Sequence, residues 1–507
     1  MKNKSRTGYS ILNTSVASAS RIITIFLGYV ARVVFTRTLD QHYVGVSGLF
    51  LDFFKLLSLS ELGISIAITY ALYQPIADGD HEKQKSVMHL YRRFYNGVAC
   101  IILVIGLLIL PFLNSLIKDQ PNVEHLQLIY LLYLSNSVLS FLYVYKKTLI
   151  DAHQQMYISM GYYGLFMTLQ YVLQIVLLIC THNFILYLLV FPVCTLIHNV
   201  AISRKAEKMF PYLKEKDIQP LSREDKQGIT KNIKAMFMHK IGTVAVQNTD
   251  SLLISSMIGI VSTACYTNYQ LIIGSVRQVL THAFQGVSAS IGNLGVEKDD
   301  QKLTAVFESI FFIDFWVYGF ASLCLFELLE PFIAISFGEN YVFSGSITFI
   351  LCLNFYLTGI RQAALSFRDS LGLFWHDRYK SIIEAAINLI ASILLASFFG
   401  TSGIFWGTFI STVAVPLWIE PYILYKHRIK KPLSSYFIKL GFYTLVLLLS
   451  GGVTHVACSY IQGDYVRQLF VKLPICLIIP NCLIWLIFHR SAEYRYVITR
   501  IRNLLKR

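Results

Sequence analysis

Five basic residues interrupt long apolar segments of the sequence. They are Arg21, Arg32, Lys55, Lys240 and Arg277. An ionisable side chain in a bilayer core costs about 2.5–3.5 kcal/mol on insertion scales, so such residues usually face a cavity or a partner. Arginine offers bidentate donors to phosphate oxygens, and lysine offers a compact charge. These residue types therefore favour a cationic cavity that binds a diphosphate group.

The spacing of these residues supports a shared cavity and also leaves alternatives open. Arg21 and Arg32 are eleven residues apart, which returns to nearly the same face of a helix at 3.6 residues per turn. A basic residue such as Lys240 could instead extend its charge toward a membrane interface.

Acidic residues accompany the basic ones. Asp52 lies one turn before Lys55, and Glu61 and Asp250 lie in apolar segments that also carry a lysine. Either these three carboxylates couple the protein to a cation, or each neutralises a nearby basic residue. The acidic residues of later apolar segments are interpreted as mostly structural: Glu308, Asp314, Glu327, Glu330, Glu384 and Glu420.

The segments that carry these residues identify a membrane protein. Of the 507 residues, 55% are hydrophobic and only 14% are charged, with a mean hydropathy of +0.55, which excludes an ordinary soluble domain. A bilayer core of about 30 Å needs roughly 20 apolar residues per helix. Fourteen such runs are expected, near residues 9–38, 42–73, 94–117, 126–147, 157–180, 183–203, 233–258, 262–294, 304–336, 343–367, 379–399, 402–425, 434–459 and 466–489.

The distribution of charge predicts the topology. Basic residues concentrate in every second turn between these runs, as the positive-inside rule describes, so both termini are expected in the cytoplasm of a bacterial cell. This pattern explains the net charge of +15 better than nucleic acid binding does. The nine cysteines lie in the apolar runs without CxxC spacing, so neither a disulfide framework nor a metal site is expected.

An internal repeat divides the chain. At an offset of about 219 residues, Asn13 aligns with Asn232 and Arg21 with Lys240. We therefore expect an all-α polytopic protein with two six-helix lobes related by a parallel repeat, followed by two C-terminal helices. The expected parts are residues 1–203 (first lobe), 204–231 (cytoplasmic linker), 232–427 (second lobe), and 428–507 (two extra spans and a basic cytoplasmic tail).

Sequence motifs give no sign of catalysis. The chain contains no Walker loop, no dinucleotide-binding fingerprint and no HExxH pair. The predicted external turns are short, whereas a membrane polymerase or glycosyltransferase normally carries its acid and base residues in a sizeable extramembrane domain. We expect no enzyme activity, no catalytic residues and no cofactor.

Two segments resemble the polysaccharide flippases of the multidrug, oligosaccharidyl-lipid and polysaccharide exporter superfamily. They are SELGISIAITYALYQPIADGD (60–80) and MHKIGTVAVQNTDSLLISSMIGI (238–260). The resemblance covers essentially the whole chain. It implies a transporter with a MATE-like fold that works by alternating access. Such a transporter would pass an undecaprenyl-diphosphate-linked oligosaccharide across the cell membrane for polysaccharide biosynthesis. By similarity to the lipid II flippase branch, the basic residues of the first, second and eighth helices would hold the diphosphate, with Lys55 standing where an arginine is expected.

The resemblance also implies the partners. These are the lipid-linked oligosaccharide and membrane lipid, with polysaccharide assembly proteins as candidates and no nucleic acid. The alternatives are a drug or cation antiporter of the same superfamily, a membrane polysaccharide polymerase or ligase, and a non-transporting scaffold. The predicted excess of cavity cations favours an anionic cargo over a cationic one.

Overall fold

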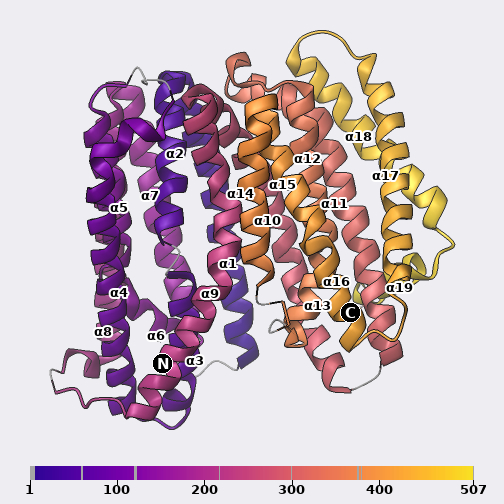
Figure 1. The fold of residues 1–507 in the computed structure, drawn as a ribbon. Coiled ribbons are helices and arrows are strands. Elements are labelled where there is room, and N and C mark those ends of the chain that lie inside the picture. Colours follow the sequence, from indigo (N-terminus) through magenta and orange to yellow (C-terminus); the bar gives the residue numbers. More distant parts are fainter. Residues whose placement is uncertain are drawn as a thin grey trace. The chain divides into compact units, whose positions relative to one another are not determined.

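The protein is described by a computed structural model covering residues 6–58, 61–118, 123–215, 217–297, 300–373, 376–377 and 379–505. All regular secondary structure in these ranges is helical (Figure 1). Contacts divide the chain into two compact units, unit 1 (Met1–Ala264) and unit 2 (Cys265–Arg507). The prediction of an all-α fold is confirmed.

Unit 1 contains nine α-helices and the short helices that join or extend them. The α-helices are α1 (Arg6–Thr38), α2 (Gln41–Leu57), α3 (Glu61–Ala77), α4 (His81–Ile109), α5 (Leu126–Phe141), α6 (Lys147–Ala152), α7 (Met156–Thr181), α8 (Phe184–Met209) and α9 (Arg223–Leu253). The short ones are η2 (Leu110–Leu116), η3 (Val144–Lys146), η4 (Pro211–Lys214) and the π-helix η5 (Ile254–Ile258).

Polar residues at the turns of unit 1 fix where its helices begin. The Asp40 carboxylate accepts from the backbone N–H of His42 at 2.9 Å and caps α2. Asp80 caps α4, Asn183 caps α8 and Ser222 caps α9 in the same way. Each side chain satisfies an N–H group that has no partner within its helix, so the polar turns predict the helix starts.

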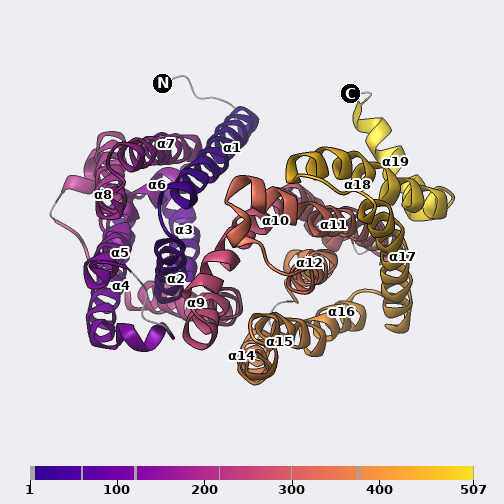
Figure 2. The same ribbon diagram turned by 90° about the horizontal axis from the view of Figure 1, so that it is seen from above.

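Buried polar contacts join the helices of unit 1. Tyr130 on α5 donates to the carbonyl of Gly106 on α4 at 2.8 Å, and Ser47 on α2 bonds the Tyr133 hydroxyl at 2.7 Å. Thr195 on α8 donates to Asn136 on α5 at 2.7 Å. Figure 2 looks along these helices and shows α1 beside α7, and α9 beside α2.

Described residues between α8 and α9 pack on α4 within unit 1. The Tyr212 hydroxyl donates to Gln84 of α4 at 2.5 Å, and Ser86 donates to the carbonyl of Gln219 at 2.5 Å. Helix α9 also belongs to unit 1 by its contacts with α2 and α3. The division of the chain at residues 204–231, and the treatment of 428–507 as a separate part, stay predictions.

Unit 2 contains the remaining helices. They are α10 (Ile260–Glu297), which begins in unit 1, α11 (Asp300–Ser336), α12 (Gly345–Ile360), α13 (Gln362–Ser370), α14 (Lys380–Phe399), α15 (Thr401–Ala414), α16 (Pro416–His427), α17 (Ser434–Ser459), α18 (Tyr465–Phe488) and α19 (Ala492–Leu505), with the short η6 (Glu339–Tyr341).

An aromatic core holds unit 2 together around α11. Phe311 stacks on Tyr436 of α17 with ring centroids 4.7 Å apart, and Phe315 stacks on Tyr443 at 4.5 Å. Trp316 donates from its indole nitrogen to Asn481 of α18 at 2.8 Å. The last two apolar helices therefore pack directly on α11.

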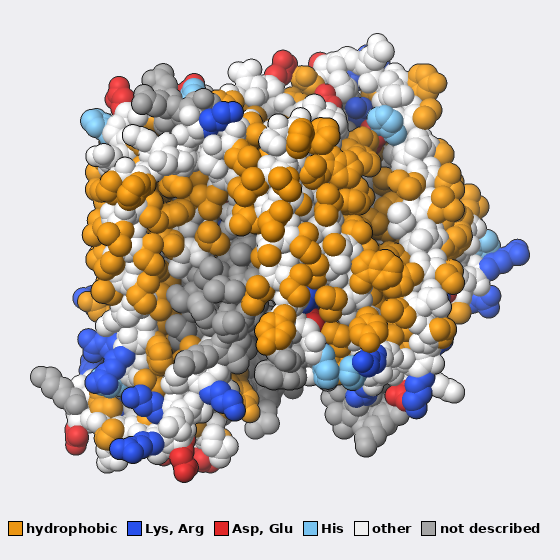
Figure 3. Space-filling view, in the orientation of Figure 1, with side chains coloured by type: hydrophobic (Ala, Val, Ile, Leu, Met, Phe, Trp, Pro, Cys, Tyr) orange, Lys and Arg blue, Asp and Glu red, His pale blue; other side chains and the backbone are white. Residues whose placement is uncertain are grey.

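The surface is that of a multi-pass membrane protein. Eleven helical segments of the described chain are long and apolar enough to cross a membrane. Figure 3 shows hydrophobic side chains over the middle of the drawn face of unit 1 and Lys and Arg side chains gathered at its lower end. The expected runs at 42–73, 233–258 and 262–294 form α2 with α3, α9 with η5, and α10, which are not among the eleven, so a count of fourteen stays a prediction.

Candidate functional site

The packing of α1 fixes the direction of its two arginines. Small residues of α1 lie against α7: a Cβ at Gly164 would lie 2.6 Å from the Ser20 hydroxyl, and one at Gly28 would lie 3.1 Å from the Tyr171 hydroxyl. Successive residues of an α-helix are rotated by 100° about its axis. Arg21 and Arg32 therefore lie about 60–80° around α1 from the midpoint between Ser20 and Gly28, both on the same side. Helix α1 is continuous, so the two arginines share one edge of it.

Arg21 in unit 1 and Arg277 in unit 2 each have a buried donor atom without an acceptor in the described part of the chain. The Nε atom of each guanidinium is buried and has no hydrogen-bond partner among the described residues. Arg32, by contrast, lies with its Cζ atom 5.6 Å from the centroid of the Phe35 ring. A buried donor without an acceptor is costly, so Arg21 and Arg277 are the described cations whose donors most need an external acceptor.

Lys55 and Asp52 form the ion pair that their spacing allows. The Lys55 Nζ lies 2.9 Å from the Asp52 carboxylate, and the lysine side chain is 62% exposed. The other Asp52 oxygen accepts from Ser251 of α9 at 2.5 Å. Asp52 therefore links α2 to α9 as well as pairing with Lys55.

The other predicted residues of this region are less fully described. Asp250 is buried in α9, 7% exposed. Lys240 lies in α9 and Glu61 begins α3, but their side chains lie outside the described part of the chain.

The segment that follows α9, from η5 to the start of α10, is in close contact with η2 and α2. Ser255 donates to the carbonyl of Leu116 at 2.9 Å, and its own carbonyl accepts from the N–H of Lys118 at 3.0 Å. A Cβ at Gly45 of α2 would lie only 2.2 Å from the carbonyl oxygen of Ile260, so only glycine fits this close approach. By the predicted topology, this junction lies at the external side.

Sequence reasoning missed a buried charge network in unit 2. Glu420 on α16 is fully buried and accepts from Arg361 at 3.0 and 2.6 Å and from Lys380 at 2.6 Å. Asp377 lies 3.4 Å from Lys380 and also pairs with Arg368. The available signal was two arginines at the end of the apolar run 343–367, which the sequence analysis did not single out.

Two helix breaks meet this network. The α12–α13 break falls at Arg361, and the α15–α16 break falls at Val415, directly before Pro416. Asp314 of α11 accepts from the N–H of Ala363 at 2.5 Å, so it caps α13 from a neighbouring helix. Irregular backbone at membrane depth requires such internal partners, which gives these charges a structural task.

Unit 1 carries a related arrangement at corresponding places. Its fourth predicted span is also broken, between α5 and α6 at η3, with Tyr143 in the left-handed region at φ 66°. Lys146 of η3 pairs with Glu207 of α8, as Arg361 pairs with Glu420. In each predicted lobe, a cation at the break of the fourth span thus meets a carboxylate of the sixth, as expected for two lobes related by an internal repeat.

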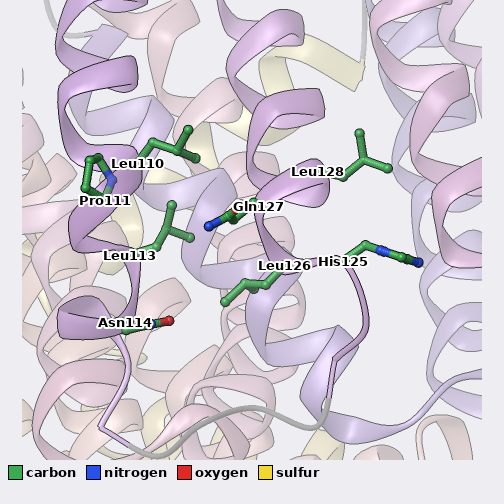
Figure 4. A pocket seen from close by; sticks show the side chains of 8 residues that line it. All are labelled: Leu110, Pro111, Leu113, Asn114, His125, Leu126, Gln127 and Leu128. Carbon is green, nitrogen blue, oxygen red and sulfur yellow. The ribbon is translucent and has the colours of Figure 1, made fainter.

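A hollow of about 440 Å³ lies between η2 and the start of α5. Figure 4 shows Asn114, Gln127 and His125 around it together with leucine side chains. The described lining holds no Lys, Arg, Asp or Glu, so it lacks the charges expected of a diphosphate site. Among the described residues, no group of three or more His, Cys, Asp or Glu is arranged to hold a metal.

Comparisons with known proteins identify the fold. No protein-family model and no curated protein sequence matches the chain. Among solved structures, the lipid II flippase MurJ in an inward closed conformation is similar with a TM-score of 0.68 and 14% identity, covering 94% of this chain and 99% of that one.

Two MATE transporters are also similar. An inward-facing MATE family transporter of the MOP superfamily matches with a TM-score of 0.62 and 15% identity over 82% of this chain and 98% of its own. A MATE transporter of Vibrio cholerae matches with a TM-score of 0.54 and 15% identity over 83% of this chain and 99% of its own. The chain therefore has the fold shared by the MurJ flippase and the MATE transporters of the MOP superfamily.

Proposed function

We propose that this protein is a transporter that flips an undecaprenyl-diphosphate-linked oligosaccharide across the bacterial cytoplasmic membrane by alternating access, for surface polysaccharide biosynthesis. The observation that carries the proposal is the buried, unpartnered Nε of Arg21 and of Arg277. A diphosphate supplies the anionic oxygen acceptors that these donors lack, and it does so in the charge-assisted geometry that guanidinium groups favour.

The remaining predicted residues have supporting roles in this proposal. Arg32, Lys55 and Lys240 add positive charge for the diphosphate, and Asp52, Glu61 and Asp250 act as charge partners or couple a cation to transport. Both termini are cytoplasmic, and the protein does not chemically alter its substrate. The likeness of fold to a lipid II flippase supports a lipid-linked cargo.

The test is leaflet exchange of a fluorescent undecaprenyl-diphosphate oligosaccharide in liposomes that contain the purified full-length protein. Wild type is compared with Arg21→Ala and Arg277→Ala. The loss of a charge-assisted hydrogen bond costs about 1.5–3 kcal/mol, so exchange should fall roughly ten-fold or more. Arg490→Ala, at an exposed arginine after the last apolar helix, is the matched control and should exchange at the wild-type rate.

Other outcomes identify the competing functions. If well-folded wild type exchanges no lipid but converts it chemically, the protein is a membrane polymerase or ligase. If it exchanges no lipid but moves a cationic drug against a proton or sodium gradient, it is an antiporter. If both arginine variants exchange lipid at the wild-type rate, the cationic site proposed here is wrong.

A further inference from the structure

A second basic site lies on unit 1, beside the η3 break and apart from the residues proposed for the diphosphate. The first turns of α4, the helix η3, residues 213–215 and Ile218 line a pocket of about 320 Å³. Five of its lining residues carry basic side chains: Lys85, His89, Arg92, Lys146 and Lys214. Glu215 is the one acidic residue among the described lining, and Glu82 and Glu207 pair with Lys85 and Lys146 from outside it. The excess positive charge of the pocket therefore rests on Arg92 and Lys214.

The basic residues of this pocket differ in how far their charges are neutralised. Lys85 is 4% exposed, and its Nζ lies 2.6 Å from Glu215 and 2.7 Å from Glu82. Arg92 and Lys214 are exposed and have no ion pair or hydrogen bond with a described side chain. The pocket therefore combines a buried, fixed ammonium group with two cations that remain available to a ligand.

The lining residues of the pocket lie at the ends of predicted membrane spans, which is the level of a membrane surface. Arg92 lies two residues before the apolar run predicted at 94–117, and the chain on its other side, from His81 to Tyr91, is rich in polar residues. Lys146 lies at the end of the apolar run predicted at 126–147. By the predicted topology, this level is that of the cytoplasmic headgroups.

We infer that this pocket binds the phosphate headgroup of an anionic lipid of the cytoplasmic leaflet. Basic pockets between membrane helices on the cytoplasmic side suit such headgroups, because the lipid presents its phosphate at the same depth as the cations. The Arg92 guanidinium donates to the phosphate oxygens in a fork, while Lys214 and Lys85 add point charges. Glu215, which is 57% exposed, competes with the lipid for Lys85. The inference does not depend on the proposed transport function.

The experiment measures lipid binding to the full-length, delipidated protein by native mass spectrometry. Phosphatidylglycerol is titrated against phosphatidylcholine with identical chains, and wild type should prefer the anionic lipid roughly ten-fold. Arg92→Ala should remove most of that preference, and Lys214→Gln should reduce it. Arg93→Ala is the matched control, because Arg93 is the exposed neighbour of Arg92 on α4 but does not line the pocket. Glu215→Gln should strengthen binding several-fold because a competing carboxylate is gone.

Several results would overturn the inference. Equal binding of the two lipids by wild type would show that the pocket has no headgroup preference. Equal losses in Arg92→Ala and Arg93→Ala would assign the preference to diffuse surface charge. If wild type shows no preference for phosphatidylglycerol but binds inorganic phosphate at millimolar concentration, and Arg92→Ala loses that binding, the pocket takes a soluble phosphate and the lipid is not its occupant. Lys214 is the exposed last residue of the short helix η4, so Lys214→Gln keeps the test valid if Arg92→Ala fails to fold.

Discussion

The buried carboxylate of Glu420 should be among the most sensitive single sites for the stability of unit 2. It accepts three hydrogen bonds, two from Arg361 and one from Lys380, and it is fully buried. Glu420→Gln keeps the size of the side chain but removes its charge. Two buried cations then lose their shared counterion, which is far more costly than losing the pair as a whole.

The expected magnitude follows from this geometry. Removing one partner of a buried ion pair costs about 3–5 kcal/mol. One kcal/mol shifts the melting temperature by roughly 2–4 °C for a unit of this size, so Glu420→Gln should melt about 6–20 °C below wild type. The double variant with Arg361→Gln removes one stranded cation as well, so its loss should be smaller than the sum of the two single losses by about 1–3 kcal/mol.

Thermal unfolding of the purified protein in one detergent, followed by tryptophan fluorescence, measures these effects. Lys430→Gln is the control, because Lys430 pairs with Asp300 at 2.7 Å but is 83% exposed, and an exposed pair contributes at most about 1 kcal/mol. If Glu420→Gln melts as close to wild type as Lys430→Gln does, the network does not stabilise the fold and the reasoning fails.

Three further variants test other parts of the structure by the same melting assay. Gly45→Ala should cost about 1–3 kcal/mol because its Cβ meets the Ile260 carbonyl oxygen, whereas Gly97→Ala, with no atom within 4 Å, should be neutral or stabilising; equal effects would contradict the close approach. Lys55→Ala should change stability by less than about 1 kcal/mol, because the lysine is mostly exposed, yet it should slow lipid exchange; unchanged exchange would remove this residue from the site. A hydrogen bond from Lys83 on α4 lowers the pKa of Asp225 below its usual 3.8. The charged carboxylate therefore stabilises the fold above pH 3.8, and this stabilisation is lost as the pH falls through the lowered pKa. The advantage of wild type over Asp225→Asn, below about 1 kcal/mol, should therefore be larger at pH 6 than at pH 3, and an equal advantage at the two pH values would refute the reasoning.

The sequence was sufficient to predict those features that depend on local spacing. The predicted apolar runs form helices. The eleven-residue spacing of Arg21 and Arg32 places both residues on one edge of α1. The α15–α16 break was also open to prediction, because Pro416 has no N–H and restricts the residue before it.

Tertiary features were beyond sequence reasoning. The α12–α13 break at Arg361 contains no proline or glycine, and its partner Glu420 is 59 residues away in the chain. Each acidic residue of the later helices looked structural when considered alone, because no periodicity connects residues on different helices. The same reason hid the contacts of α9 with α2, which need the folded positions of both helices.

The packing of α9 has a consequence for dividing the polypeptide. A cut in the polar segment between α8 and α9 produces a first fragment that ends with η4 and a second that begins with α9. The second fragment then carries the helix whose neighbours, α2 and α3, are on the first. Two separately expressed fragments would thus hold complementary surfaces, with Asp52 on one and Ser251 on the other, and would reassemble through α9. The conspicuous break in hydropathy at this segment is therefore a poor place to obtain two independent halves.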